Sequence, residues 1–254
     1  MLQPKQILLF LAIHHEGDWE KMYADIRNKD MVNLYGEKTI LDTCNAYTGN
    51  FITILDKEYP ESIKRGLKPP FVLFYEGDIN LLTSKTPKVA VLNSRTTSDK
   101  KINDYLLDHT PFINVMGGSV VDGNIIEDHK ENKYIVIFGE GLQNNSIKTV
   151  KNNVVKGKGL ALSQYPTGTI TNSYHYLSRC STIASVCDKV LVVSSKKKGS
   201  QMVIVNMALY NGKDILVVPT NLDLEDSINN ELLLEGAIPV TNKDQLDKLA
   251  LENC

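Results

Sequence analysis

Turns rich in Gly, Ser, Thr, Arg and Lys recur along this chain of 254 residues, and they carry groups that bind phosphate. Hydroxyls and backbone amides donate hydrogen bonds to phosphate oxygens, and an Arg guanidinium binds them through a planar fork. Glycines let a backbone approach a ligand closely. The candidate binding residues in these turns are Ser94, Arg95, Thr96, Gly117, Gly118, Gly139, Gln164, Tyr165, Thr167, Gly168, Lys197, Lys198, Gly199 and Ser200.

The first two turns suit an anion. In Asn93–Thr96 two hydroxyls flank Arg95, although a helix cap with a surface Arg is the alternative. Gly117-Gly118 exposes backbone amides, but it is not the G-x-G-x-x-G fingerprint of a dinucleotide site. Gly139-Glu140-Gly141 is as compatible with a plain tight turn, because Glu140 repels phosphate.

Two later turns add an aromatic ring and a basic run. Tyr165 has a face on which a base could stack, or it is a structural residue of its turn. Lys196-Lys197-Lys198 precedes a predicted helix start, where amides and lysines together attract anions. A solvated lysine run is the alternative, and the Walker pattern G-x-x-x-x-G-K-[ST] is absent.

We find no pattern of residues typical of an enzyme. The five histidines are scattered, no G-x-S-x-G motif occurs, and no carboxylate pair stands at a predicted strand end. The four cysteines form no C-x-x-C pair, which argues against a zinc site. We therefore expect a protein without catalytic activity, metal or cofactor.

The fold class follows from short, almost continuous apolar runs that each lead into one of these turns. Such runs are typical of strands buried on both faces of a parallel sheet. Because ligands of open parallel sheets bind beyond the carboxyl ends of the strands, we expect the turns to share one edge. The runs are Val89–Leu92, Phe112–Met116, Tyr134–Phe138, Leu160–Leu162, Val190–Val193 and Ile215–Val218.

Helical segments alternate with these runs, which predicts an α/β fold: an extended, Rossmann-like, mostly parallel sheet with a small N-terminal helical appendage. We place the appendage at residues 1–55, a connector with an edge strand at 56–87, and the Rossmann-like core at 88–254. The net charge of −2 argues against a strongly basic nucleic-acid binder, but it leaves room for a local basic rim. No signal peptide or membrane span is evident, so we expect a cytoplasmic protein that makes no membrane contact.

The connector resembles a known family. Glu58–Ile63 and Pro69–Asp78 look like the entry segment of the DNA-processing protein A (DprA/Smf) family. The likeness covers roughly residues 56 to 245. It continues in order through Val89–Arg95, Gly117-Gly118, Gly139–Leu142, Ser163–Gly168, Lys198–Ser200 and Glu235–Ala237. We expect a short, divergent member without the family's optional C-terminal winged-helix-like domain.

This resemblance implies a protein that binds single-stranded DNA at the strand ends, loads a RecA-type recombinase during natural transformation, forms a homodimer and is not an enzyme. It also adds Arg179 to the candidate residues, because Tyr176–Ser181 matches the family's F-x-x-R-N-R helix start with only Arg179 still basic. Val120 replaces another basic position, and the lysine run could compensate in part.

Two other functions are considered. A weakened cationic edge also suits a Rossmann-like sensor of a small nucleotide or phosphate ligand. A nucleotide-processing phosphoribohydrolase is a third hypothesis, but the P-G-G-x-G-T-x-x-E motif of that group is absent.

Overall fold

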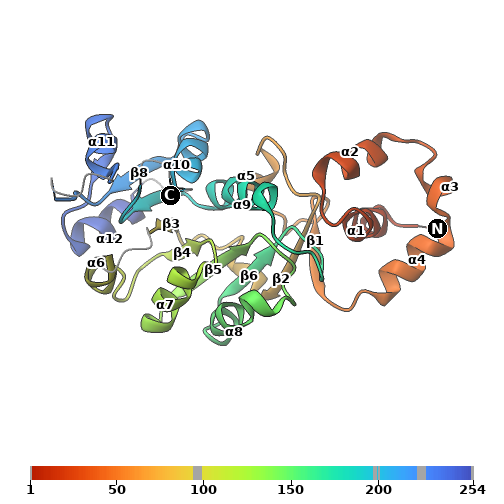
Figure 1. Cartoon of the computed structure of the whole chain (residues 1–254), viewed down its shortest axis with the longest axis horizontal. Coiled ribbons are helices and arrows are strands. Elements are labelled where there is room, and N and C mark those ends of the chain that lie inside the picture. Colours follow the sequence, from red (N-terminus) through yellow and green to blue (C-terminus); the bar gives the residue numbers. More distant parts are fainter. Residues whose placement is uncertain (1, 94–98, 197–198, 200, 222–226, 253–254) are drawn as a thin grey trace.

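The computed structural model describes residues 2–93, 99–196, 199, 201–221 and 227–252. In this part of the chain, nine strands form one sheet in the order β1-β2-β6-β5-β4-β3-β7-β8-β9 (Figure 1). The strands are β1 (Asn50–Thr53), β2 (Val72–Gly77), β3 (Lys88–Leu92), β4 (Ile113–Met116), β5 (Lys133–Phe138), β6 (Leu160–Ser163), β7 (Lys189–Val192), β8 (Asp214–Val217) and β9 (Ile238–Pro239).

Every pairing from β6 through β9 is parallel, so the carboxyl ends of these strands lie along one edge. This confirms the predicted mostly parallel sheet. The reason is visible in the burial: every residue of β3, β4, β6 and β7 is buried. A strand covered on both faces needs apolar side chains in both directions, which explains the continuous runs.

Helices cover both faces of the sheet. α5 (Glu61–Lys64), α9 (Ser173–Val186), α10 (Gln201–Tyr210) and α11 (Asn229–Leu234) supply apolar side chains to one core cluster. α6 (Asp99–Leu106), α7 (Val120–Asp128), α8 (Lys148–Lys156) and α12 (Lys243–Leu251) belong to the other side. Figure 1 shows α5, α9 and α10 above the sheet, with α7 and α8 below it. This part of the chain also has two short 3-10 turns, η1 (Ile79–Leu81) and η2 (Asn145–Ile147).

The N-terminal segment differs from the prediction at its end. Its helices are α1 (Pro4–His14), α2 (Trp19–Arg27), α3 (Met31–Tyr35) and α4 (Glu37–Ala46), but Asn50–Thr53 is the strand β1. β1 pairs antiparallel with β2, which itself pairs antiparallel with β6. The predicted edge strand around Phe71–Tyr75 is therefore not at the edge, because β1 covers it. The prediction of a helical segment through residue 55 is wrong from Asn50 onward.

The N-terminal helices pack into the same core cluster as α6, α7, α8 and α12. Leu8 to Ala12 of α1 are at most 6% exposed and belong to the same apolar cluster as Val72 and Phe74 of β2. None of the helices in the described part of the chain combines the length and apolar character needed to cross a bilayer.

A carboxylate links α2 to α3 and to the residue that follows α1. The Oδ2 atom of Asp25 in α2 lies 2.7 Å from Nε2 of His15, and it accepts a hydrogen bond of 2.7 Å from the Tyr35 hydroxyl in α3. Burial by itself raises the pKa of Asp25, but the hydrogen bonds from Tyr35 and His15 outweigh it and hold that pKa below its usual value. The bond to Asp25 raises the pKa of Tyr35 to about 12.

We expect Asp25→Asn to destabilise the protein by about 1–2 kcal/mol at pH 7, because it removes a charged hydrogen-bond acceptor. A folded pKa below the unfolded value means that the carboxylate stabilises the fold above about pH 4 and loses this effect as the pH falls further. Urea unfolding at pH 7 and pH 3 measures it. The difference between wild type and variant should shrink at pH 3, whereas exposed Asp42→Asn in α4 should change little at either pH.

Candidate nucleic-acid interface

Three predicted turns lie side by side at the carboxyl edge of the sheet. Gly117-Gly118 follows β4, Gly139 follows β5 and Gln164 follows β6. These strands are neighbours and parallel, so their ends are about 4.8 Å apart from one to the next. The sheet thus brings together residues that are far apart in the sequence.

The Gly117-Gly118 turn is shaped by contact with the core. Gly118 has φ +71°, and a Cβ atom there would lie 2.5 Å from the ring of Phe138, which is 1% exposed. Ser119 then caps α7: its hydroxyl accepts a hydrogen bond from the Asp122 amide, and the Asp122 side chain accepts one from the Ser119 amide. The backbone therefore passes tightly over Phe138 as it leaves the strand.

Arg179 holds its charge against this turn. Its Nη1 donates a 2.6 Å hydrogen bond to the carbonyl oxygen of Gly117, and the guanidinium carbon lies 4.3 Å from the Tyr176 ring centroid. Its Nε is buried without a hydrogen-bond partner among the described residues. Burial raises the pKa of nearby Asp122, and the Arg179 charge counteracts that rise. A cation is thus positioned at the carboxyl end of β4.

The helix that carries Arg179 starts earlier than predicted. The family resemblance matched Tyr176–Ser181 to a helix start, but α9 begins at Ser173, where Asn172 accepts a hydrogen bond of 2.9 Å from the His175 amide. Arg179 consequently lies inside the helix, and residues Ser173 to Ser178 form an additional helical surface beside the edge.

Tyr165 is not available to a base. Its side chain is fully buried and stacks on His175 with 3.9 Å between ring centroids. Gln164 donates a 2.6 Å hydrogen bond to its hydroxyl. Of the two alternatives for Tyr165, the burial supports the structural turn residue, because α9 covers the face on which a base would stack. Burial also lowers the pKa of His175, which favours its neutral form.

Gly139 is likewise covered. It is buried, and a Cβ atom there would lie 3.1 Å from the Thr171 hydroxyl. Glu140 accepts hydrogen bonds from Asn144, at 3.0 Å, and from Ser146. These contacts support the plain tight turn and correct the expectation that Gly139 meets a ligand.

At the carboxyl end of β3, a polar side chain connects the strand to α10. Gln201, at the start of α10, donates a 2.9 Å hydrogen bond to the Asn93 carbonyl at the end of β3, which places neighbouring Gly199 near that strand. The predicted residues Ser94, Arg95, Thr96, Lys197, Lys198 and Ser200 lie outside the described residues. Their roles stay predictions.

The family model of DNA recombination-mediator protein A matches residues 50–250. This chain belongs to that family. The match confirms the DprA/Smf resemblance, and it begins at β1, within residues 1–55 that were predicted to form the helical appendage.

The chain is similar to named proteins and to solved structures of this family. The DNA processing protein DprA of Streptococcus pneumoniae (strain ATCC BAA-255 / R6) is 27% identical over 201 residues, which cover 75% of this chain and 70% of that protein. A solved structure of DNA processing protein A from Streptococcus pneumoniae matches with a TM-score of 0.71 at 23% identity, over 97% of this chain and 95% of that one. The structure from Helicobacter pylori matches with a TM-score of 0.69 at 24% identity, over 81% and 97%. At these identities the two structures establish the fold.

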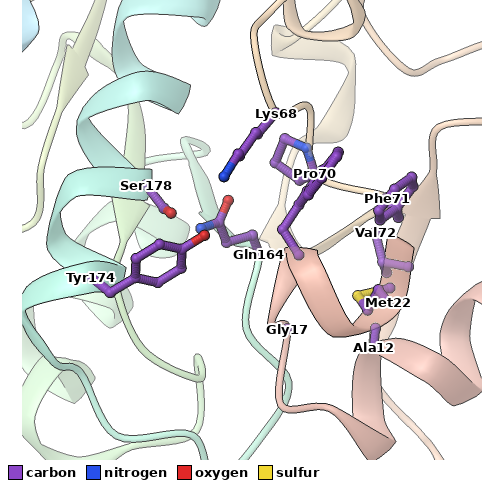
Figure 2. A pocket seen from close by; sticks show the side chains of 11 residues that line it. Ala12, Gly17, Met22, Lys68, Pro70, Phe71, Val72, Gln164, Tyr174 and Ser178 are labelled. Carbon is purple, nitrogen blue, oxygen red and sulfur yellow. The ribbon is translucent and has the colours of Figure 1, made fainter. Parts of the chain in front are cut away.

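The 164–168 turn of this family member faces two separate hollows. Thr167 borders a hollow of about 450 Å³, also lined by Tyr47, Tyr75 and Glu76. Gln164 instead lines a cleft against the N-terminal helices, with Lys68, Tyr174 and Ser178 (Figure 2). Gly168 is an exposed tip with φ +91° and open space around it. The turn therefore does not close around one pocket.

The sequence did not point to three residues that line this cleft, namely Lys68, Tyr174 and Ser178. Tyr174 and Ser178 are four residues apart and so share a helix face, but this signal is visible only once the helix is known to begin at Ser173. Lys68 precedes Pro69-Pro70, and its place beside α9 depends on the path of the loop.

Possible metal ligands also come together away from this edge. Among the described residues, Asp108, His109 and Glu131 form such a group, and all three are exposed. They precede β4 and β5, so they lie at the opposite, amino-terminal edge of the sheet.

Proposed function

We propose that this family member binds single-stranded DNA at the carboxyl edge of its sheet, mainly through phosphate groups. The observation that carries the proposal is Arg179, held against Gly117 where β4 ends. Family membership supports this proposal. The Helicobacter pylori structure supports it as well, because its subject is the single-stranded DNA binding mode of that protein. Phosphate contacts need cations, and Arg179 supplies one at this edge.

We propose further that the bound strand is passed to a RecA-type recombinase, that the protein acts as a homodimer in the cytoplasm, and that it catalyses no reaction itself. The family description as a recombination mediator supports the first point. The sequence-based roles of Arg95, Lys197 and Lys198 belong to the same proposal: they would extend the cationic edge beyond β3 and β7.

The alternative of a small phosphate ligand has less support. The hollow beside Thr167 is large enough for one, but Glu76 is the only charged side chain among its described lining residues. Glu76 accepts a 2.9 Å hydrogen bond from Lys151, so the Lys151 ammonium is already paired with a carboxylate. A carboxylate at the wall disfavours an anionic ligand.

The test is fluorescence anisotropy with labelled oligo-dT over a series of salt concentrations. Arg179→Ala should weaken binding about tenfold, because a charge-assisted hydrogen bond is lost. It should do so for all base sequences, since phosphate contacts carry no base information. The slope of log affinity against log salt should fall by about 0.7. Arg95→Ala tests the sequence-based assignment in the same assay.

Lys156→Ala is the matched control. It also removes one positive charge, but exposed Lys156 ends α8 at the amino edge of the sheet. It should leave affinity nearly unchanged. Equal affinity of the Arg179 and Lys156 variants, or no binding by wild type at low salt, would contradict the proposal. Thermal unfolding of both variants shows whether they remain folded.

A further inference from the structure

A cleft between the N-terminal helices and α9 lies directly beside the proposed DNA edge. Its lining comes from three parts of the chain: α1 and α2 with their connecting turn, the loop before β2, and the end of β6 with α9. In Figure 2 the polar ends of Lys68, Gln164, Tyr174 and Ser178 point toward one another, and the apolar side chains of Met22 and Val72 lie to their right.

Two of these groups form the floor of the cleft and two its mouth. Gln164 and Ser178 both hydrogen-bond to the buried Tyr165 hydroxyl, so they are engaged with the protein. Lys68 and Tyr174 are more exposed: the Lys68 side chain is 51% exposed and Tyr174 is 44% exposed. An ammonium and a phenolic hydroxyl both donate hydrogen bonds, which suits an anionic ligand.

Lys68 is held in place by weak, exchangeable contacts. Its ammonium pairs with the Glu20 carboxylate, which is 60% exposed, and lies 5.6 Å from the Trp19 ring centroid. The Trp19 ring is anchored by a 2.9 Å hydrogen bond from Nε1 to the Pro69 carbonyl. An ion pair in solvent contributes little to stability, so an incoming phosphate could replace Glu20 at little cost.

The cleft continues the DNA edge. Ser178, in its floor, is the residue before Arg179 on α9, and Gln164 follows β6, two strands from the β4 end where Arg179 binds Gly117. With neighbouring strands about 4.8 Å apart, these two strand ends are separated by about 10 Å. One bound single strand, which typically covers about 4–16 nucleotides, can reach both places.

We propose that Lys68 and Tyr174 bind a backbone phosphate of single-stranded DNA, so that the bound strand runs from the sheet edge onto the junction with the N-terminal helices. The inference rests on the proposed function. It assigns the N-terminal helices a role in DNA binding: α2 supplies Trp19, which positions Lys68, and Glu20, which competes with the phosphate.

The test compares oligo-dT of about 6 and about 20 nucleotides, lengths on either side of a typical site size. Lys68→Gln should weaken binding of the longer strand about tenfold, the equivalent of one charged contact, and change binding of the shorter strand much less. Tyr174→Phe, which removes only the hydroxyl, should act in the same direction. Glu20→Gln should strengthen binding of the longer strand, an effect that a merely structural role for Lys68 would not produce.

Lys64 and Glu61 provide the control pair. They form an ion pair of 2.9 Å on α5, nearby in the chain, but neither lines the cleft. Lys64→Gln and Glu61→Gln should leave both affinities nearly unchanged. If wild type binds, Arg179→Ala weakens binding and Lys68→Gln behaves like Lys64→Gln, the inference is overturned and the proposed function stands. If wild type binds neither oligonucleotide, both fail.

Discussion

Gly118→Ala is expected to lower the free energy of unfolding by about 2–5 kcal/mol, the sum of left-handed backbone strain and overpacking. Gly118 has φ +71°, and the added Cβ would lie 2.5 Å from the Phe138 ring and 3.1 Å from a Val136 methyl group. Both neighbours are buried strand residues of β5, so they cannot swing away into solvent. Urea unfolding followed by circular dichroism measures the change.

Gly212→Ala separates the two causes. Gly212 follows α10 with φ +70°, and a Cβ atom there meets nothing within 4 Å. This variant should therefore lose only about 1–2 kcal/mol, the cost of the left-handed conformation. Equal losses for the two variants would contradict the claim that Phe138 sets the close approach at Gly118. Because Gly117 precedes this position, any Gly118 variant that folds should also bind DNA more weakly.

Asn229→Leu is expected to destabilise the protein by about 2–4 kcal/mol, since it leaves several buried polar groups without partners. Asn229 is fully buried; its Nδ2 donates to the carbonyl oxygens of Val193, at 3.0 Å, and Val218, at 2.8 Å. Its Oδ1 accepts a 2.7 Å hydrogen bond from Ser195. The side chain thus ties together the chain segments that leave β7 and β8.

Neighbouring Asn230→Leu is the comparison. Asn230 accepts from the Thr220 amide at 3.1 Å and donates to its carbonyl oxygen at 2.8 Å, but it is only partly buried. In the variant, water can reach the Thr220 amide and carbonyl that lose their partner, so a loss of about 1 kcal/mol in the free energy of unfolding is expected. A loss at Asn229 no larger than at Asn230 would show that the buried contacts do not hold the strand ends. Differential scanning calorimetry ranks the two variants.

The strands of the parallel sheet could be predicted because each is defined by its own residues. Val89–Leu92 and Ile215–Val218 are apolar throughout, and the structure has β3 at Lys88–Leu92 and β8 at Asp214–Val217. A strand buried on both faces has the same requirement at every position, so no knowledge of its partner is needed. The direction of the chain then predicts where each strand ends. Because the strands are parallel, it also predicts the edge that carries Gly117 and Gln164.

β1 could not be predicted in this way. Asn50–Thr53 is a short segment with only its last two residues buried, and it forms a strand because β2 offers a free edge to pair with. Strand formation depends strongly on such cross-strand neighbours. The start of α9 had a local signal in Asn172, but Ser173 to Ser178 show no apolar stripe to indicate a helix.

The local pattern of the chain thus specified the buried parallel strands and the edge at which their turns gather, because those features repeat the preferences of single residues. Only the packed molecule decided which turn residues are exposed and which are covered. Tyr165 is buried because His175 and Gly17 close over its ring, and Lys68 reaches α9 because the loop before β2 passes beside it. Exposure and proximity of this kind arise from segments that are distant in the sequence, and no spacing within one segment encodes them.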